Sequence, residues 1–221
     1  MTNVNIWNLK KKELQIYLTG RCKHSHHYYE HPSCFLKELN IDEKVGIFDI
    51  ECSGLKADFG IMLTYCIKDE NKDKYYTGRI RKKELKDYSF DKRLVENCIR
   101  DLGKFDKIIT YYGSKFDFPF LRSRSLYWDI PFFKYNDLNH KDVYYSVKSK
   151  LCIHRNRLSD ACRLLGIEGK TNIHSDYWIK ALVGDKRSLD YVLEHNIADC
   201  DILEKLYHKM EVFTKNTNKS I

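Results

Sequence analysis

The segment VGIFDIEC, residues 45–52, is the first informative stretch of the chain, because it is an apolar run that carries two acids near its end. Side chains alternate across a β-strand, so Asp49 and Glu51 fall on one face, with Cα atoms about 6.6 to 6.8 Å apart. Neighbouring carboxylates repel each other, and burying either one without a partner is costly. A bound divalent cation would remove this cost. The alternative is an edge strand on which both acids face solvent.

Strand and helix patterns alternate after this segment, which predicts one mixed α/β domain over residues 45–213. Further β-rich runs cover residues 59–69, 74–80 and 106–113, and the first two of these extend residues 45–52 into a meander. Expected helices cover residues 93–105, 117–127, 140–153, 157–165, 175–183 and 188–212. Residues 1–44 show no long periodicity and are interpreted as a small N-terminal extension, and residues 214–221 as a polar tail.

The segment YYGSKFDFPFLRSRS, residues 111–125, places a third acid just after the strand predicted over residues 106–113. Gly113 permits a tight turn, and Asp117 lies at the entry to the short helix that follows. Arg122 and Arg124 in this helix offer partners for phosphate groups. Asp117 also has a simpler interpretation as a helix N-cap.

The helix predicted over residues 188–212 carries a fourth acid on its apolar side. At about 100° per residue, Asp199 falls in line with the apolar positions, with His195 one turn before it. The apolar positions are Val192, Leu203, Leu206 and Met210, and the outward face is expected to carry Asp190, Glu194, Asp201, Glu204 and Lys205. Acids are almost never fully buried unless they are paired or bound to metal. A salt bridge to Lys or Arg is the alternative to a metal ion.

These three segments, in this order, resemble the exonuclease motifs of the DnaQ-like DEDD superfamily of 3′-to-5′ exonucleases, which has the ribonuclease H fold. FDIECSGL is similar to the first motif, YYGSKFDFPFL to the second and HNIADCDILEKLY to the third. The resemblance covers about residues 45–210 and is closest to YprB-like ribonuclease H-like domains and the proofreading domains of family B DNA polymerases. It implies a mixed central sheet flanked by helices. It also implies four metal-binding, catalytic carboxylates: Asp49, Glu51, Asp117 and Asp199.

Two positions depart from the family pattern. Tyr112 stands where many relatives have Asn. The third motif has the spacing of the Tyr-x-x-x-Asp subgroup, with His195 at the Tyr position. With a reference pKa of about 6.5, His195 is a more natural base at neutral pH than tyrosine, which makes it the candidate for orienting or deprotonating water. Tyr191, one turn earlier in the helix, is the reserve candidate.

The resemblance implies a metal-dependent 3′-to-5′ exonuclease with two Mg²⁺ or Mn²⁺ ions, since hard oxygen ligands suit these ions better than zinc. The expected substrate is single-stranded DNA or RNA with a free 3′ end. A polymerase or another replication or repair protein is a candidate partner. Two alternatives stay open: a structure-specific endonuclease on the same fold, and a nucleic-acid-binding module whose catalytic centre has decayed.

The 221 residues carry 39 Lys and Arg against 31 Asp and Glu, a net charge of +8 that is compatible with a polyanionic partner. A local excess of basic residues lies beside the predicted site, although a solvated helix face explains such a run equally simply. The candidates for binding nucleic acid are Lys115, Arg122, Lys148, Lys150, Arg155 and Arg157. No apolar run approaches membrane-spanning length and no signal peptide is evident, so we expect a cytoplasmic protein without a membrane partner.

The N-terminal extension contains CKHSHHYYEHPSC, residues 22–34, which holds four of the nine histidines between two cysteines. Cys22, His24, His31 and Cys34 form a candidate Cys₂His₂ set for one structural Zn²⁺, with a spacing unlike that of common zinc fingers. The alternative is a mobile basic and aromatic arm that contacts nucleic acid. The eight cysteines form no CxxC pair, and a disulfide framework is not expected.

Overall fold

The structure is a computed structural model that describes residues 4, 6, 9–39, 43–134, 137–169, 171 and 174–213. The predicted polar tail, residues 214–221, lies outside the described residues. At the centre is a five-stranded sheet with the order β3-β2-β1-β4-β5. Its strands are β1 Val45–Cys52, β2 Met62–Asp69, β3 Lys74–Arg79, β4 Lys107–Thr110 and β5 Asn139–Asp142.

The sheet has an antiparallel half and a parallel half that meet at β1. Strands β1, β2 and β3 pair antiparallel as a meander, whereas β1, β4 and β5 pair in parallel. The predicted meander is therefore confirmed. Because β1 is the central strand, the alternative that Asp49 and Glu51 lie on an edge strand is wrong.

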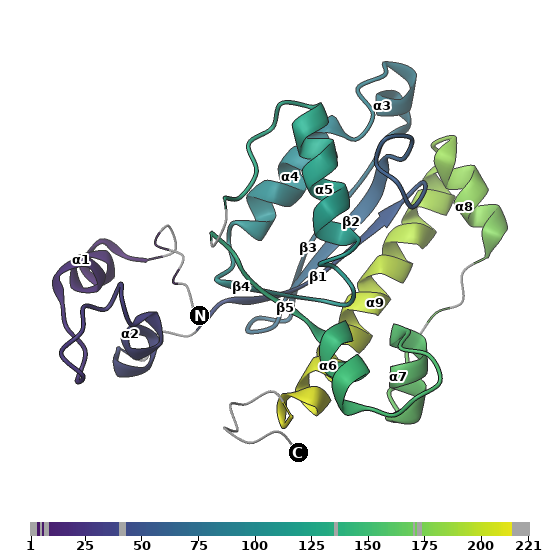
Figure 1. The fold of residues 1–221 in the computed structure, drawn as a ribbon. Coiled ribbons are helices and arrows are strands. Elements are labelled where there is room, and N and C mark those ends of the chain that lie inside the picture. Colours follow the sequence, from purple (N-terminus) through teal and green to yellow (C-terminus); the bar gives the residue numbers. More distant parts are fainter. Residues whose placement is uncertain are drawn as a thin grey trace.

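Helices cover both faces of this sheet (Figure 1). Helices α4 and α5 pack against one face, and the long helix α9 crosses the other, where it contacts β1, β2 and β3 as well as α6, α7 and α8. The helices after β3 are α3 Lys82–Lys86, α4 Lys92–Leu102, α5 Asp117–Tyr127, α6 Val143–Lys150, α7 Leu158–Leu164, α8 Ser175–Leu182 and α9 Lys186–Glu211. The arrangement confirms a mixed α/β fold of the ribonuclease H type.

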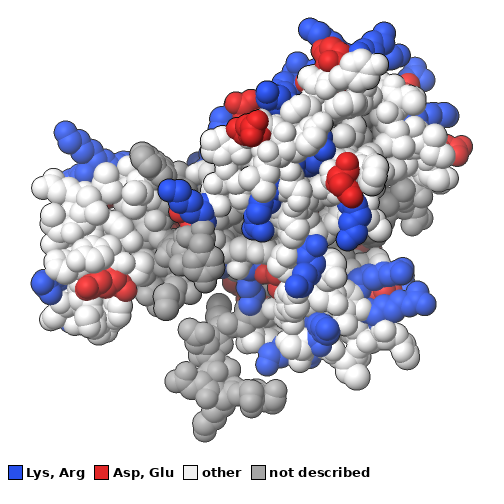
Figure 2. All heavy atoms as spheres, turned by 45° about the horizontal axis from the view of Figure 1, so that its top comes forward, with Lys and Arg blue, Asp and Glu red and all other residues white. Residues whose placement is uncertain are grey.

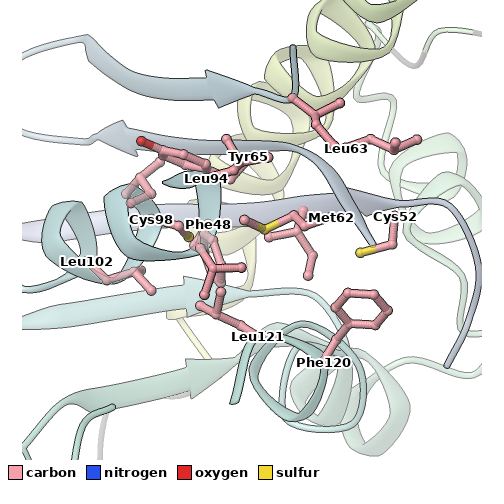
Figure 3. Packing of buried hydrophobic residues seen from close by; sticks show 14 of the residues in the cluster. Phe48, Cys52, Met62, Leu63, Tyr65, Leu94, Cys98, Leu102, Phe120 and Leu121 are labelled. Atoms are coloured by element: carbon pink, nitrogen blue, oxygen red, sulfur yellow. The ribbon is translucent and has the colours of Figure 1, made fainter. Parts of the chain in front are cut away.

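The two faces of β1 belong to two different hydrophobic clusters. Phe48, Ile50 and Cys52 belong to the cluster that holds the apolar side chains of α4 and α5, part of which is drawn in Figure 3. Val45 and Ile47 belong to the second cluster, which holds the apolar side chains of α9. Side chains alternate along the strand, so the next two on the face of Val45 and Ile47 are Asp49 and Glu51. Both acids therefore point toward α9.

The expected helix over residues 140–153 is wrong at its start. Residues Asn139–Asp142 form β5, which pairs in parallel with Lys107–Thr110, and the helix begins only at Val143. All four residues of β5 are half-buried and polar, so they lack the apolar alternation that marks a strand in sequence. The neighbouring strand fixes their conformation instead. Helix α3, Lys82–Lys86, was likewise not expected.

The N-terminal extension contains two short helices, α1 Lys11–Thr19 and α2 Pro32–Glu38, which the sequence pattern did not predict. They enclose a small apolar cluster that includes Tyr17, Tyr28 and Phe35. Each helix is too short for a helical period to stand out. Within the described part of the chain, no helix combines the length and apolarity needed to cross a membrane.

Candidate active site

Three of the predicted site residues meet where β1 ends against α9. The Nε2 atom of His195 lies 3.8 Å from Glu51 Oε1 and 3.9 Å from Asp199 Oδ2. The ligand atoms of these three residues lie within 4.8 Å of one another. Helix α9 places His195 and Asp199 four residues apart on the side that faces β1, because one helical turn separates them. The side chains are well buried, with exposures of 2% for His195, 13% for Asp199 and 18% for Glu51.

Asp49 lies two residues before Glu51 on the same face of β1. Its Oδ2 accepts a 2.5 Å hydrogen bond from Asn196 Nδ2, and Asn196 Oδ1 in turn accepts one from the Thr64 hydroxyl at 3.3 Å. Asn196 is fully buried. This residue was not predicted from the sequence, although it lies between His195 and the acid of the third motif. Its amide fixes the Asp49 carboxylate and connects α9 with β1 and β2.

Asp117 reaches the same region from the first turn of α5. The pairing of β1 with β4 ends at Ile47, and further along β1 the Ile50 N–H donates to Asp117 Oδ1 at 3.1 Å. The carboxylate thus takes the place of a strand partner at this end of the sheet. Asp117 is 3% exposed. The interpretation of Asp117 as a helix N-cap is wrong, because α5 begins at Asp117 and its N-cap position is Phe116.

The four carboxylates form one electrostatic unit. Burial raises the pKa of Asp49 well above its usual range, and the neighbouring carboxylates of Asp117, Glu51 and Asp199 raise it further, while the Asn196 amide lowers it. Burial also raises the pKa of Asp117 to about 7, despite the opposing hydrogen bond from the Ile50 N–H. Among the described residues, neither Asp49 nor Asp117 forms an ion pair with Lys or Arg. Concentrated, buried oxygen donors of this kind suit Mg²⁺ or Mn²⁺.

The imidazole ring of His195 is contacted at both of its nitrogen atoms. Its Nδ1 contacts the hydroxyl of Thr171, which leaves Nε2 directed at Glu51 and Asp199. The reserve candidate Tyr191 points elsewhere: its ring stacks on Tyr177 in α8 at 4.4 Å, and its hydroxyl accepts a hydrogen bond from the His174 N–H. His195, in contrast, contacts the carboxylates of Glu51 and Asp199.

Asp142, at the end of β5, organises the loop that precedes Asp117. Its carboxylate accepts hydrogen bonds from the N–H of Tyr112 at 2.8 Å, and from both the N–H and the hydroxyl of Ser114. It also caps α6 through the Tyr144 N–H. Tyr112 has a φ of 66°, in the left-handed region that Asn adopts more readily than bulky residues. The Asp142 carboxylate holds this backbone conformation through the Tyr112 N–H.

The candidate nucleic-acid-binding residues are all exposed and come from several elements. Lys115 lies between β4 and α5, Arg122 lies on α5, and Lys148 and Lys150 lie on α6. On the face drawn in Figure 2, Lys and Arg side chains are spread over the molecule and outnumber Asp and Glu.

Arg155 and Arg157 differ from the others because they line a cleft. Its volume is about 520 Å³, and its aromatic walls are Tyr111, Tyr112 and Tyr144. The rings of Tyr112 and Tyr144 meet edge to face at 4.8 Å. The cleft lies beyond the carboxyl end of β4, the same sheet edge at which the β1 acids stand. The two arginines were predicted from the sequence, whereas the tyrosines were not.

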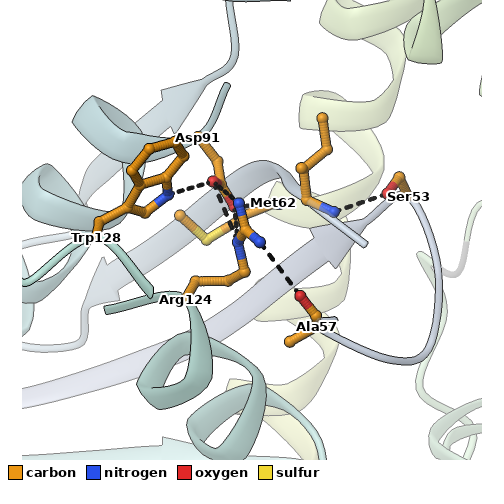
Figure 4. A network of polar contacts seen from close by, with 7 residues as sticks. Ser53, Ala57, Met62, Asp91, Arg124 and Trp128 are labelled. Atoms are coloured by element: carbon orange, nitrogen blue, oxygen red, sulfur yellow. Dashed lines mark hydrogen bonds and ion pairs between the residues drawn. The ribbon is translucent and has the colours of Figure 1, made fainter. Parts of the chain in front are cut away.

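The interpretation of Arg124 as a phosphate partner is wrong. Its side chain is 6% exposed, and its guanidinium forms a bidentate ion pair with the fully buried carboxylate of Asp91. Trp128 and the N–H of Met62 donate to the same carboxylate (Figure 4). Arg124 is therefore a structural residue that joins α5 to β2 and to the start of α4.

The expected outward face of α9 also needs correction. Asp201 and Glu204 both pair at 2.8 Å with Lys68, a residue of β2 whose side chain is only 9% exposed. Tyr75 donates a further hydrogen bond to Asp201 at 2.7 Å. These two acids lie against the sheet because a buried lysine needs their charge, whereas Glu194 and Lys205 are exposed as expected.

The Cys/His set of the extension also comes together. The Sγ atoms of Cys22 and Cys34 and the ring nitrogens of His24 and His31 lie within 4.8 Å of one another. This second group is built from residues of the N-terminal helical segment alone and is separate from the acidic site in sequence.

The fold and the acidic centre define the class of protein: an α/β protein of the ribonuclease H type with clustered carboxylates at the end of its central strand. The model of the RNase H superfamily matches residues 47–211, and the chain belongs to this superfamily. A comparison with curated proteins finds no match.

A solved structure shares this fold at low sequence similarity. The family B DNA polymerase from the hyperthermophilic archaeon Pyrobaculum calidifontis is similar with a TM-score of 0.63 and 14% identity. The alignment covers 78% of this chain and 25% of the polymerase, so the chain spans about a quarter of that protein. The likeness agrees with the predicted resemblance at the level of the fold.

Proposed function

We propose that this protein is a metal-dependent nuclease that removes nucleotides from the 3′ end of single-stranded DNA or RNA. The observation that carries the proposal is the convergence of four acids from three elements around Asp49, whose pKa is raised first by burial and then by the other three carboxylates. Membership in the RNase H superfamily supports a nucleic acid as substrate. Removal from the 3′ end rests on the order and spacing of the three motifs.

Asp49, Glu51, Asp117 and Asp199 would hold the metal ions. Two Mg²⁺ or Mn²⁺ ions, when bound, would activate water and stabilise the leaving 3′ oxygen of the phosphodiester. Asn196 keeps the Asp49 carboxylate in one orientation through its amide. Asp117 is held by the Ile50 N–H, so that both acids keep their place before any cation arrives.

His195 is the proposed group that orients or deprotonates the attacking water. Its Nε2 faces the carboxylates and its Nδ1 contacts the Thr171 hydroxyl, a contact that fixes the ring plane. The proton would pass to Nε2, where Glu51 and Asp199 stabilise the resulting imidazolium. A hydrolytic step needs no further reactant than water.

The cleft of Tyr111, Tyr112 and Tyr144 is the proposed binding place for the single strand. Tyr112 is the exposed ring of this cleft, and exposed aromatic rings stack with bases of any sequence, while Arg155 and Arg157 can bind phosphates. Each arginine that neutralises one phosphate should contribute about 0.7 to the log-log salt slope of single-strand binding. A polymerase or another replication or repair protein as partner is an extension of the proposal that rests on the resemblance.

Cleavage of 5′-labelled single strands tests the proposal. We expect a ladder that shortens from the 3′ end with Mg²⁺ or Mn²⁺ and is absent in Asp49→Asn and Asp199→Asn. Glu194→Gln is the matched control, since this exposed acid lies on α9 next to His195. Binding without any cleavage, on single-stranded, duplex and branched substrates alike, would contradict the enzyme and favour a decayed binding module.

Blocked ends separate the two modes of cleavage. A 3′-blocked strand and a circular single strand should both resist an exonuclease, while an endonuclease on the same fold would cut them internally. Replacement of Arg157 by Gln should weaken binding and reduce the salt slope by about 0.7 if this residue binds one phosphate.

A further inference from the structure

The N-terminal segment of residues 9–39 brings two cysteines and two histidines together from two local structures. Cys22 and His24 lie in a tight turn closed by the Cys22 N–H to His26 carbonyl bond, at 2.9 Å. His31 is the N-cap residue of α2, and Cys34 lies in the first turn of that helix. The turn and the helix start thereby direct two ligand atoms each toward a common point.

The four contacts between sulfur and nitrogen are all of similar length. The Nδ1 atom of His24 lies 3.8 Å from Cys22 Sγ and 3.4 Å from Cys34 Sγ. The Nδ1 atom of His31 lies 3.8 Å from Cys22 Sγ and 3.9 Å from Cys34 Sγ. A tetrahedral zinc ion with Zn–S bonds of about 2.3 Å and Zn–N bonds of about 2.0 Å sets its sulfur and nitrogen ligands about 3.5 Å apart. One observed contact lies at this separation, and the other three are longer by only 0.3 to 0.4 Å.

Hydrogen bonding does not account for the same arrangement. An imidazole Nδ1 carries either one proton or one lone pair, so each histidine can make one good hydrogen bond with sulfur at this atom. Two nitrogens therefore account for two of the four contacts. A cation bound to all four ligand atoms accounts for the four contacts together.

The size of the segment provides a second, independent reason for a metal. Chains shorter than about 40 residues usually need disulfides, a metal or a partner to fold, because they bury too little apolar surface. The apolar cluster of this segment is small, with Tyr17, Tyr28 and Phe35 at its centre. Cys22 is itself a buried member of that cluster, so a metal bound there would join the turn to α2 beside the apolar cluster.

We infer that Cys22, His24, His31 and Cys34 bind one structural zinc ion that folds the N-terminal segment. Four protein ligands leave no open coordination position, which assigns the ion a structural and not a catalytic role. The two histidines coordinate through Nδ1. This inference does not depend on the proposed nuclease activity, because none of its residues belongs to the acidic site.

Metal analysis of the full chain is the first test. We expect about one zinc ion per chain after purification under reducing conditions, and loss of zinc in Cys22→Ser and His31→Asn. Loss of an outer-shell partner typically lowers metal affinity by about 10- to 100-fold, and loss of a ligand should lower the zinc affinity by more than this. The control variants are Cys152→Ser, an exposed cysteine, and His26→Asn, whose ring lies 4.3 Å from that of His31. Both should retain zinc.

Cobalt substitution of the wild-type chain keeps the inference testable if the ligand variants fail to fold. Co²⁺ in this site should give the absorption of a tetrahedral ion together with thiolate-to-metal charge transfer. Removal of the metal should raise amide hydrogen exchange in residues 9–39 and leave β1 protected. The inference is overturned by a reduced full chain that holds no zinc and gives no thiolate band with Co²⁺, or by a Cys22–Cys34 disulfide in the native protein.

Discussion

Replacing Asp117 with asparagine tests whether the buried acids of the site lower the free energy of unfolding of the metal-free protein. The Asp117 carboxyl is 3% exposed, and burial raises its pKa to about 7. An unfolded aspartate has a pKa of about 3.9, so the difference of about 3 units corresponds to about 4 kcal/mol. The asparagine has nearly the same shape, and its Oδ1 can still accept the Ile50 N–H, so the substitution removes mainly the charge.

The sign of this effect depends on pH in a defined way. Because the pKa of Asp117 is higher in the folded than in the unfolded state, the carboxyl is neutral in both states below about pH 4 and costs nothing there. The cost develops as pH rises from about 4 to 7 and is complete above pH 7. At pH 8 without divalent metal, Asp117→Asn should be more stable than the wild type by up to about 4 kcal/mol, and near pH 4 the two should converge.

Urea unfolding followed by tryptophan fluorescence measures this difference, since the chain has three tryptophans. Added Mg²⁺ should stabilise the wild type far more than the variant, because a cation compensates a charge that asparagine lacks. The exposed acid Glu194 provides the control, and Glu194→Gln should show neither effect. A variant that is less stable than the wild type at pH 8, or a difference that does not change with pH, would refute the reasoning.

Three further substitutions separate structural from positioning roles. Arg124→Met leaves the buried carboxylate of Asp91 without its cation, which should lower the free energy of unfolding by about 3 to 5 kcal/mol in thermal unfolding. The affinity of the folded variant for single strands should stay unchanged. Asn196→Ala removes the amide that holds Asp49, so it should raise the Mg²⁺ concentration for half-maximal cleavage by about 10- to 100-fold. If the variant cleaves like the wild type at every Mg²⁺ concentration, Asn196 has no positioning role. Lys68→Met should lower the free energy of unfolding in urea by up to about 3 kcal/mol, because two acids of α9 then lie against the sheet without their cation. A loss below about 0.5 kcal/mol would contradict a buried ion pair.

The elements that carry the site were predictable because their patterns are long. The strand predicted over residues 45–52 coincides with β1, and the helix over 188–212 differs from α9 by two residues at its start and one at its end. Period-2 alternation and a continuous apolar stripe fixed the faces of both elements, and the acids on those faces followed. The start of α5 at Asp117 was predictable from the turn before it.

Polar residues whose conformation depends on distant partners were not predictable. The strand β5 has the sequence NHKD and forms because β4 supplies its hydrogen bonds. Asn196 looks like any polar residue of a helix until Asp49 and Thr64 are placed beside it. Lys68 lies buried in β2, and this position turns Asp201 toward the sheet. In each case a single long-range contact, absent from the local pattern, decides the outcome.

The two candidate metal sets relate to stability in opposite ways. The acids around Asp49 are assembled by the sheet, α5 and α9, and their burial and mutual repulsion disfavour the charged carboxylates until a cation binds. The Cys/His set around Cys22 has only a small apolar cluster beside it, so the ion itself would supply much of the folding free energy. Oxygen donors favour Mg²⁺ or Mn²⁺, whereas thiolates favour zinc, so millimolar Mg²⁺ does not displace zinc. Metal removal should therefore unfold the N-terminal segment while it leaves the ribonuclease H fold intact, because that fold is held by its sheet and helices and not by an ion.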